Sequence, residues 1–115
     1  MRISRDDEAR LWLAGFAPEP DNFDWDAGNR TKNLKHGVGS EEIASIFYQA
    51  RFVFAGKITE LAHHEWRGLI LGRSDSGRSL ALIFTRRGDR LRAISCRPMR
   101  PNERRLYEAN IQEYS

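Results

Sequence analysis

The sequence predicts an α+β protein in which N-terminal helices precede an antiparallel four-stranded meander, and a short C-terminal helix follows it. The spacing of apolar residues changes from a period of about 3.6 to one of about 2 near residue 50, as expected where helices give way to strands. The later strands are separated only by tight turns, Asp75-Ser76-Gly77 and Arg87-Gly88-Asp89, so neighbouring strands must run antiparallel. A chain of 115 residues suits one hydrophobic core.

Residues 1–22 are predicted to form an N-terminal extension made of a short helix and a linker. Ser4 is a candidate N-cap for this helix, and Gly15 is expected to end it. Pro18 and Pro20 interrupt any helical pattern after it. We therefore expect an appendage that a short loop joins to the rest of the chain.

Residues 23–115 are predicted to be the main domain. Phe23–Trp25 alternates apolar and polar side chains and is interpreted as an edge strand. Asp26 is a candidate N-cap for a polar helix that runs to Lys35. Ser40 is expected to cap a second helix, which has acidic residues in its first turn and an apolar face.

The predicted sheet and the closing helix occupy the rest of the chain. Four segments are interpreted as strands: Phe52–Phe54, Trp66–Gly72, Leu80–Thr85 and Leu91–Arg97. Two prolines then end the sheet. Asn102 is expected to cap a closing helix with Leu106, Ile111 and Tyr114 on one side.

The charge of the chain is unevenly distributed. The net charge is +3, but residues 1–27 are acidic and residues 86–105 carry a strong excess of arginine. Every cation in the second window is Arg and none is Lys. Because the guanidinium group offers a planar fork that fits phosphate and carboxylate, a polyanion or an acidic protein partner is expected.

Several classes of protein are not expected from this sequence. The charged first residues contain no apolar segment typical of a signal peptide, and no stretch is long enough to cross a bilayer, so a cytoplasmic location without membrane contact is expected. Cys96 is the lone cysteine, which excludes an internal disulfide. His63 and His64 are adjacent and would point to opposite faces of a strand. No metal or other cofactor is therefore predicted.

His36 is a candidate general base, because imidazole can accept a proton near neutral pH. A proton taken from a ribose 2′-hydroxyl would start the cleavage of RNA by its own backbone. The alternative is a histidine at a helix end that donates to the last carbonyl groups beside Gly37. The residues alone leave both interpretations open.

The arginines are candidates to bind the scissile phosphate and to stabilise its developing charge. Strict alternation along Leu91–Arg97 would place Arg97 on the same face as Leu91, and Arg92 on the other face with Cys96. Glu65 and Arg67 would share a strand face, either as a structural ion pair or as a phosphate-binding arginine oriented by its glutamate. Tyr107 is interpreted as a core residue, a base-stacking platform or a proton donor.

An ordered set of motifs resembles the BrnT family of type II toxins. The motifs span Phe23 to about Glu108 and are Phe23-Asp24-Trp25-Asp26, Gly28-Asn29, Lys32, Lys35-His36-Gly37-Val38, Phe47, Glu65-x-Arg67, Leu71-Gly72, Phe84-Thr85-x-Arg87-Gly88, Arg92-x-Ile94-Ser95-x-Arg97 and Glu103-Arg104-x-x-Tyr107-Glu108. Residues 1–22 precede the usual start of the family.

The resemblance implies a RelE-like fold and a ribonuclease toxin that stops translation. It also implies a cognate BrnA-type antitoxin with a ribbon-helix-helix domain, through which the complex would contact operator DNA. A dimer and a toxin–antitoxin heterotetramer are both compatible with the sequence. No metal is required if arginines stabilise the transition state, so metal-independent cleavage through the 2′-hydroxyl is expected.

The predicted site follows from these motifs together with the arginine pattern. The predicted catalytic residues are His36, Arg67, Arg87 and Arg97, supported by Lys35, Glu65 and Tyr107. The predicted RNA-binding residues are Lys32, Arg92, Arg100 and Arg104. The competing hypothesis is a non-catalytic basic module that only seats an antitoxin or RNA, and a metalloenzyme is a more distant third.

Overall fold

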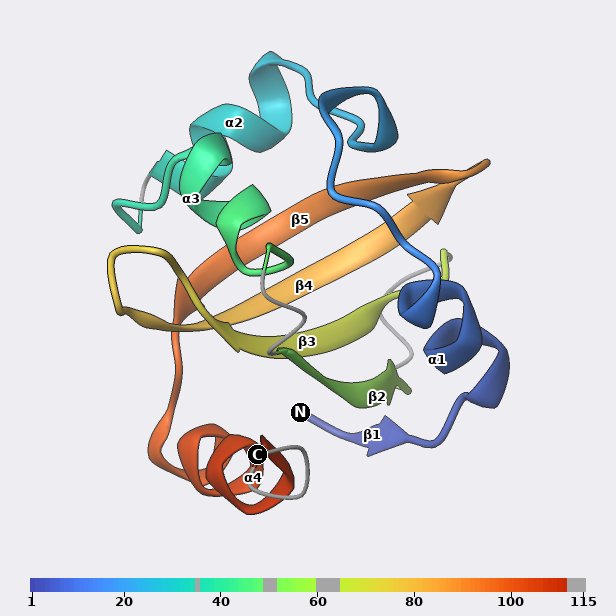
Figure 1. Ribbon diagram of the computed structural model, residues 1–115, viewed down its shortest axis with the longest axis vertical. Coiled ribbons are helices and arrows are strands. Elements are labelled where there is room, and N and C mark those ends of the chain that lie inside the picture. Colours follow the sequence, from blue (N-terminus) through green and yellow to red (C-terminus); the bar gives the residue numbers. More distant parts are fainter. Residues whose placement is uncertain (35, 49–51, 60–64, 112–115) are drawn as a thin grey trace.

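The computed structural model describes the backbone of residues 1–34, 36–48, 52–59 and 65–111. The elements, in chain order, are β1 (Ile3–Ser4), α1 (Asp7–Ala14), a 3₁₀ turn (Pro20–Asn22), α2 (Ala27–Leu34), α3 (Ser40–Ser45), β2 (Phe52–Ile58), β3 (Gly68–Arg73), β4 (Ser79–Arg87), β5 (Arg90–Pro98) and α4 (Pro101–Ile111) (Figure 1).

The predicted α+β class is confirmed, but the predicted number of strands is wrong. The sheet has five strands in the order β1-β2-β3-β4-β5, and every neighbouring pair is antiparallel (Figure 1). The strand that the sequence did not predict is β1, which pairs only Ile3 with Ile58 and Ser4 with Lys57. A two-residue strand has no alternating pattern to detect. Gly56 makes room for it, since a Cβ there would lie 2.5 Å from the Ser4 carbonyl oxygen.

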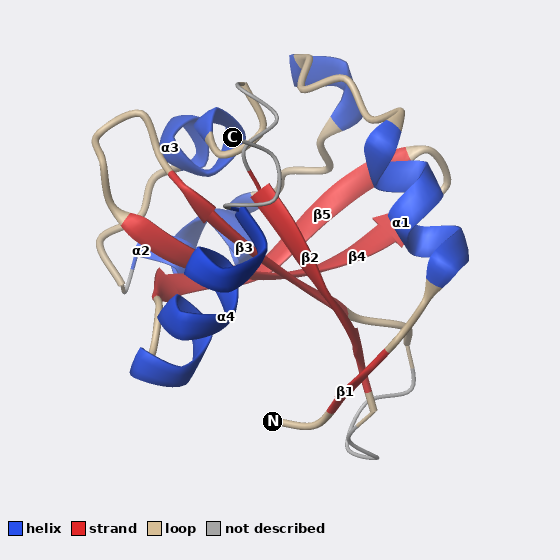
Figure 2. Cartoon of the chain, turned by 60° about the horizontal axis from the view of Figure 1, so that its bottom comes forward, coloured by secondary structure: helices blue, strands red, loops and turns tan. Residues whose placement is uncertain are grey.

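The twisted sheet separates two hydrophobic layers (Figure 2). One face, here called the α1–α3 face, buries Ile70, Leu82 and Phe84 against side chains of α1, α3 and the segment after α3. The other, the α4 face, buries Leu71 and Tyr107 with their neighbours against α4. Helix α4 packs mainly on β2 and β3, so the end of this face formed by the β4–β5 hairpin lies away from α4.

The N-terminal segment is part of the main core. Ala9 and Leu13 of α1 are buried in the same cluster as Phe23. The predicted N-cap Ser4 is wrong, because Ser4 lies in β1, and the carboxylate of Asp6 accepts a hydrogen bond from the Ala9 amide at 3.0 Å. Residues 1–22 therefore add a short strand to one end of the sheet edge and cover part of one face of the sheet.

Helix α2 is fastened to the outer edge of β5. Asp26 caps it as predicted: the Asn29 amide donates to the Asp26 carboxylate at 3.1 Å, and the Asp26 amide donates to the Asn29 side chain at 2.8 Å. The Asn29 side-chain nitrogen also donates to the Asp24 and Ala93 carbonyls. The predicted edge strand Phe23–Trp25 is reduced to one isolated parallel bridge to Leu91.

Two further helix starts differ slightly from the predicted ones. Ser40 is the first residue of α3 and Gly39 occupies the cap position, without a side-chain hydrogen bond. Helix α4 begins at Pro101, so Asn102 lies inside its first turn. Its buried face carries Tyr107 and leaves Leu106 exposed, while Tyr114 lies outside the described residues.

A bulge in β5 overturns the predicted alternation of its arginines. Ile83 pairs with Ser95 and Phe84 with Ala93, so Ile94 is an extra residue in β5. The insertion moves every later side chain to the opposite face. Cys96 is consequently buried on the α1–α3 face, and Arg97 shares the α4 face with Arg92.

Candidate functional site

Predicted site residues gather at the end of the α4 face that is formed by the β4–β5 hairpin and lies away from α4. Arg67 immediately precedes β3, Arg87 ends β4, and Glu65 lies in the segment before Arg67. The Arg67 Nη2 is 3.6 Å from one Glu65 carboxylate oxygen, and the Arg87 Nη2 is 4.0 Å from the other. We call Glu65, Arg67 and Arg87 the Glu65 cluster. Two guanidinium groups share one carboxylate, so the cluster carries a net positive charge.

The arginines of the Glu65 cluster keep unused hydrogen-bonding capacity. Both contacts with Glu65 are longer than a hydrogen bond. Within the described residues, the buried Nε of Arg67 has no hydrogen-bond acceptor. The Arg87 side chain is 53% exposed, and Arg90, its partner across the hairpin, is also exposed. This end of the sheet can therefore accept an anion.

Trp66 holds the two outer residues of the Glu65-Trp66-Arg67 tripeptide in place. Its indole nitrogen donates to the Asp6 carboxylate at 2.9 Å, and its carbonyl accepts from the Thr85 hydroxyl at 2.5 Å. Asp6 also caps α1, and that hydrogen bond from the helix is the largest influence lowering its pKa. The N-terminal segment is thus coupled to the Glu65 cluster, a connection that the sequence analysis did not predict.

Aromatic packing fixes the indole ring from the opposite side. Trp66 lies edge-to-face with Phe84 and stacks near Phe54. Gly68 permits this approach, because a Cβ there would lie 2.7 Å from the Trp66 ring and 2.8 Å from the Phe84 ring. The backbone beside Arg67 is therefore held on both sides by buried groups.

Arg92, a predicted RNA-binding residue, is held by the entry to α2. Its Nη1 lies 2.9 Å from the Asp26 carboxylate and 3.7 Å from that of Asp24, and its side chain is only 13% exposed. The ion pair with Asp26 raises the pKa of Arg92 and lowers that of Asp26. Within the described residues, the geometry of this contact leaves the buried Nη1 of Arg92 without a hydrogen bond. The negative charge of Glu65 is a smaller influence in the same direction, raising the pKa of Arg92.

Arg97, a predicted catalytic residue, lies toward the other end of β5 in a bidentate ion pair. Its two terminal nitrogens donate to the two carboxylate oxygens of Glu103 at 2.7 and 2.9 Å. Burial pushes the pKa of Glu103 upward, but hydrogen bonds from Arg97 and the Arg100 amide outweigh it and lower the pKa. The Arg97 and Glu103 side chains are 14% and 7% exposed. This pair fastens α4 to the sheet.

His36, the predicted base, lies far along the sheet from the Glu65 cluster. It occupies an exposed turn, and the carbonyl of the next residue, Gly37, accepts from Arg78 at 2.7 Å. Arg78 belongs to the β3–β4 hairpin, whereas Arg67 and Arg87 lie at the opposite ends of these two strands. The structure therefore does not bring His36 close to Arg67 or Arg87.

The other predicted site residues are scattered. Lys35 and the side chain of Lys32 lie outside the described parts of the structure. Arg100 and Arg104 are exposed at the start of α4, and Tyr107 is buried in the core of the α4 face. Of the three interpretations of Tyr107, its burial favours the core residue.

Neither a metal site nor a reactive cysteine is found in the described part of the chain. No three His, Cys, Asp or Glu side chains there come together in a way that could hold a metal ion, and His63 and His64 are not among the described residues. Cys96 is buried, and burial raises the pKa of its thiol to about 12. It is therefore a packing residue.

A comparison with known protein families adds to what the fold and this arginine-rich surface indicate. Residues 25–103 match the family model described as "Ribonuclease toxin, BrnT, of type II toxin-antitoxin system". The match covers more than half of the 115-residue chain, and the protein therefore belongs to the BrnT family of ribonuclease toxins. Membership of a type II system implies a protein antitoxin as partner.

The matched region contains the whole Glu65 cluster but excludes α1 and most of α4. No curated protein matches the chain. Among the described residues, no helix combines the length and apolar character needed to cross a bilayer.

Proposed function

We propose that this protein is a metal-independent endoribonuclease that inhibits translation. It would cut RNA by using the 2′-hydroxyl of the RNA itself as the nucleophile. The observation that supports this most directly is the Glu65 cluster, where two arginines share one carboxylate at 3.6 and 4.0 Å at the end of the α4 face that lies away from α4. The proposal includes a RelE-like fold and a cytoplasmic place of action, both of which fit a toxin that acts on RNA during translation.

In the proposed reaction, Arg67 and Arg87 bind the non-bridging oxygens of the scissile phosphate. The Glu65 carboxylate accepts the proton of the ribose 2′-hydroxyl, whose oxygen forms a new bond to phosphorus. The bond from phosphorus to the 5′-oxygen breaks, and that oxygen takes a proton from solvent. The products are a 2′,3′-cyclic phosphate and a 5′-hydroxyl end. The two guanidinium groups offset the charge that builds up on the pentacovalent phosphorus.

Neighbouring cations would guide the rest of the RNA chain. Arg90 stands opposite Arg87 in the hairpin and is exposed. Arg100, just before α4, and Arg104, on α4, are exposed and would extend the electrostatic attraction, so cleavage should weaken as salt is added. We assign a structural role to Arg97 and Arg92, since both are mostly buried against carboxylates.

The proposed antitoxin is of the BrnA type, with a ribbon-helix-helix domain that would make the contacts to operator DNA. The competing function is a non-catalytic module that binds RNA or antitoxin through the same basic surface. Exposed Arg87 and Arg90 would serve either function, so charge alone does not separate the two. The position of Glu65 between two arginines favours catalysis.

A cleavage assay with matched variants tests the proposal. Purified protein, freed from antitoxin, is incubated in EDTA with total RNA, beside Arg67→Ala and Arg73→Ala. Arg67 precedes β3 and Arg73 ends it, so each variant loses one cation at one end of the same strand. We expect Arg67→Ala to lose cleavage by a factor of about 10²–10³, as when one transition-state donor is removed. Arg73→Ala should remain near wild type.

Two results would count against the proposal. Equal loss in both variants would mean that only overall charge matters, which is the behaviour of a binding module. If the wild type does not cleave RNA either alone or with translating ribosomes, the catalytic proposal fails.

A further inference from the structure

The sheet has a strand edge that β1 covers only in part. Strand β1 pairs with Lys57 and Ile58, at the C-terminal end of β2. Within the described residues, no strand pairs with the outer edge of Phe52–Ala55. A strand edge of this kind presents unpaired backbone donors and acceptors to any extended segment that can reach it. Figures 1 and 2 show β2 at this side of the sheet, with the short β1 beside it.

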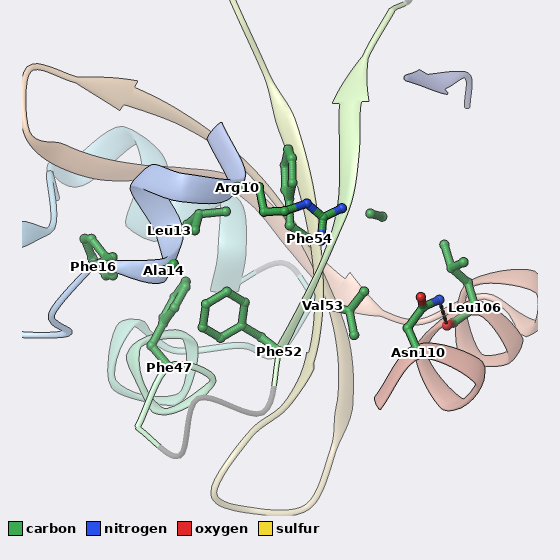
Figure 3. A pocket seen from close by; sticks show the side chains of 11 residues that line it. Arg10, Leu13, Ala14, Phe16, Phe47, Phe52, Val53, Phe54, Leu106 and Asn110 are labelled. Atoms are coloured by element: carbon green, nitrogen blue, oxygen red, sulfur yellow. Dashed lines mark hydrogen bonds between the residues drawn. The ribbon is translucent and has the colours of Figure 1, made fainter. Parts of the chain in front are cut away.

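The open edge lies in a groove of about 370 Å³ that is lined mainly by apolar side chains. Figure 3 shows its floor on β2, one wall on α1 with Leu13 and Ala14, and the other wall on α4 with Leu106 and Asn110. Leu106 is 36% exposed, although it belongs to a helix that buries another face. Because Leu106 lies in the groove wall, its exposed apolar side chain is available to pack against a bound partner.

The groove has the charge of a site for an acidic segment. Arg10 reaches from α1 toward β2, and it is the one charged side chain among the groove's described lining residues (Figure 3). No carboxylate lines the groove in this part of the chain. A carboxylate on an occupant would therefore face a cation without repulsion, while its apolar side chains would pack on Phe52, Phe54 and Leu106.

We propose that an extended segment of the antitoxin adds to the sheet as a strand along Phe52–Ala55, with apolar side chains in the groove and an acidic residue against Arg10. The inference rests on membership of a type II toxin family, which supplies a protein partner. Main-chain hydrogen bonds would supply much of the affinity, and the groove walls would select side chains. Four strand residues span about 13 Å, a short anchor.

The residues of the groove walls would make the proposed contact specific to this member of the family. Arg10, Leu13, Leu106 and Asn110 all lie outside residues 25–103, the part that matches the family model. Selectivity for one antitoxin over those of other family members would then come from α1 and α4. The open strand edge itself lies inside the matched region.

Two variants that add negative charge to the groove walls test the contact. The measurement is the affinity of each variant for the purified cognate antitoxin. Leu106→Glu places a carboxylate on one wall, and Arg10→Glu reverses the charge of the other. Leu11→Glu is the matched control, because Leu11 lies on α1, is 73% exposed and does not line the groove. We expect at least about tenfold weaker binding for the first two variants, since each opposes the acidic segment, and wild-type binding for Leu11→Glu.

Two further measurements separate this inference from its rivals and from the proposed function. Amide hydrogen exchange at Phe52–Ala55 should slow in the complex if a strand is added. RNA cleavage by free Leu106→Glu and Arg10→Glu should equal that of the wild type, so a toxin that fails to cleave would still leave the docking test intact. Unchanged affinity in both variants, or unprotected amides, would overturn the inference. Dimerisation of the free toxin that Leu106→Glu abolishes would instead assign the groove to a second copy.

Discussion

Two regions of the α4 face use arginine in opposite ways. Toward the end of β5, Arg97 is held by both oxygens of Glu103 at 2.7 and 2.9 Å, and both side chains are mostly buried. At the hairpin end, Arg67 and Arg87 stand 3.6 and 4.0 Å from a single carboxylate. Both terminal nitrogens of Arg97 donate to Glu103, whereas Arg67 and Arg87 retain donors for a ligand. An arginine-rich sequence therefore does not identify the functional arginines until their partners are known.

The largest expected effect is on stability and comes from breaking the buried pair. Arg97→Ala leaves the carboxylate of Glu103, which is 7% exposed, without its partner. We expect the free energy of unfolding to fall by about 3 kcal/mol, measured by urea denaturation. The double variant Arg97→Met with Glu103→Leu should recover most of that loss, because no buried charge remains. Normal stability of Arg97→Ala together with loss of RNA cleavage would restore the catalytic role predicted from the sequence.

A slightly smaller effect is expected from neutralising Glu65, the shared carboxylate of the cluster. Glu65→Gln keeps the size of the side chain but removes the group that would accept the 2′-hydroxyl proton. Cleavage should slow by about 10²-fold, the lower end for general-base catalysis, with little change in stability because the side chain is 40% exposed. Single-turnover cleavage with saturating enzyme measures the chemical step. A rate equal to that of the wild type would show that Glu65 only orients the arginines.

A third variant tests the link between the N-terminal segment and the cluster. Asp6→Ala removes the N-cap of α1 and the acceptor of the Trp66 indole. We expect a loss of about 1–2 kcal/mol in unfolding free energy, the usual cost of a lost cap, and slower cleavage as Trp66 shifts. Asp7→Ala is the control, since its exposed carboxylate forms an ion pair with the neighbouring Arg5 and, among the described residues, does not contact Trp66. Unchanged cleavage in Asp6→Ala would mean that α1 does not position the site.

The last expected effect is a pH dependence of stability and concerns another tightly held carboxylate, that of Glu42. Arg78 and the hydroxyls of Ser76 and Ser74 lower its pKa from 4.5 to about 2. Because the folded-state pKa lies below the unfolded one, this contribution to stability is complete above pH 4.5 and is lost as pH falls toward 2. Urea midpoints measured through this window should decline less steeply for Glu42→Gln than for the wild type. Parallel curves would contradict the assignment.

The sequence analysis succeeded where local chemistry decides structure. The change of apolar period and the turn residues correctly placed the four long strands, and Asp26 caps α2 as expected. Glu65 and Arg67 were singled out by spacing, and the structure places their charged groups 3.6 Å apart, which fits the ion-pair interpretation and leaves the phosphate-binding one a proposal. Strand β1 was not predicted because two residues are too few to show an alternating pattern. They form a strand because β2 offers a free edge there and Gly56 leaves room for the Ser4 backbone.

The sequence by itself determined the class of fold, the all-arginine charge of residues 86–105 and the family motifs, because these depend on residue type and short-range spacing. Only the tertiary structure decided which arginines are available to a ligand. One extra residue at Ile94 moves Arg97 to the α4 face, where it pairs with Ala81 across the strands and meets Glu103 from α4. A guanidinium's role depends on its nearest carboxylate, and residues far apart in the chain become neighbours only after the strands align.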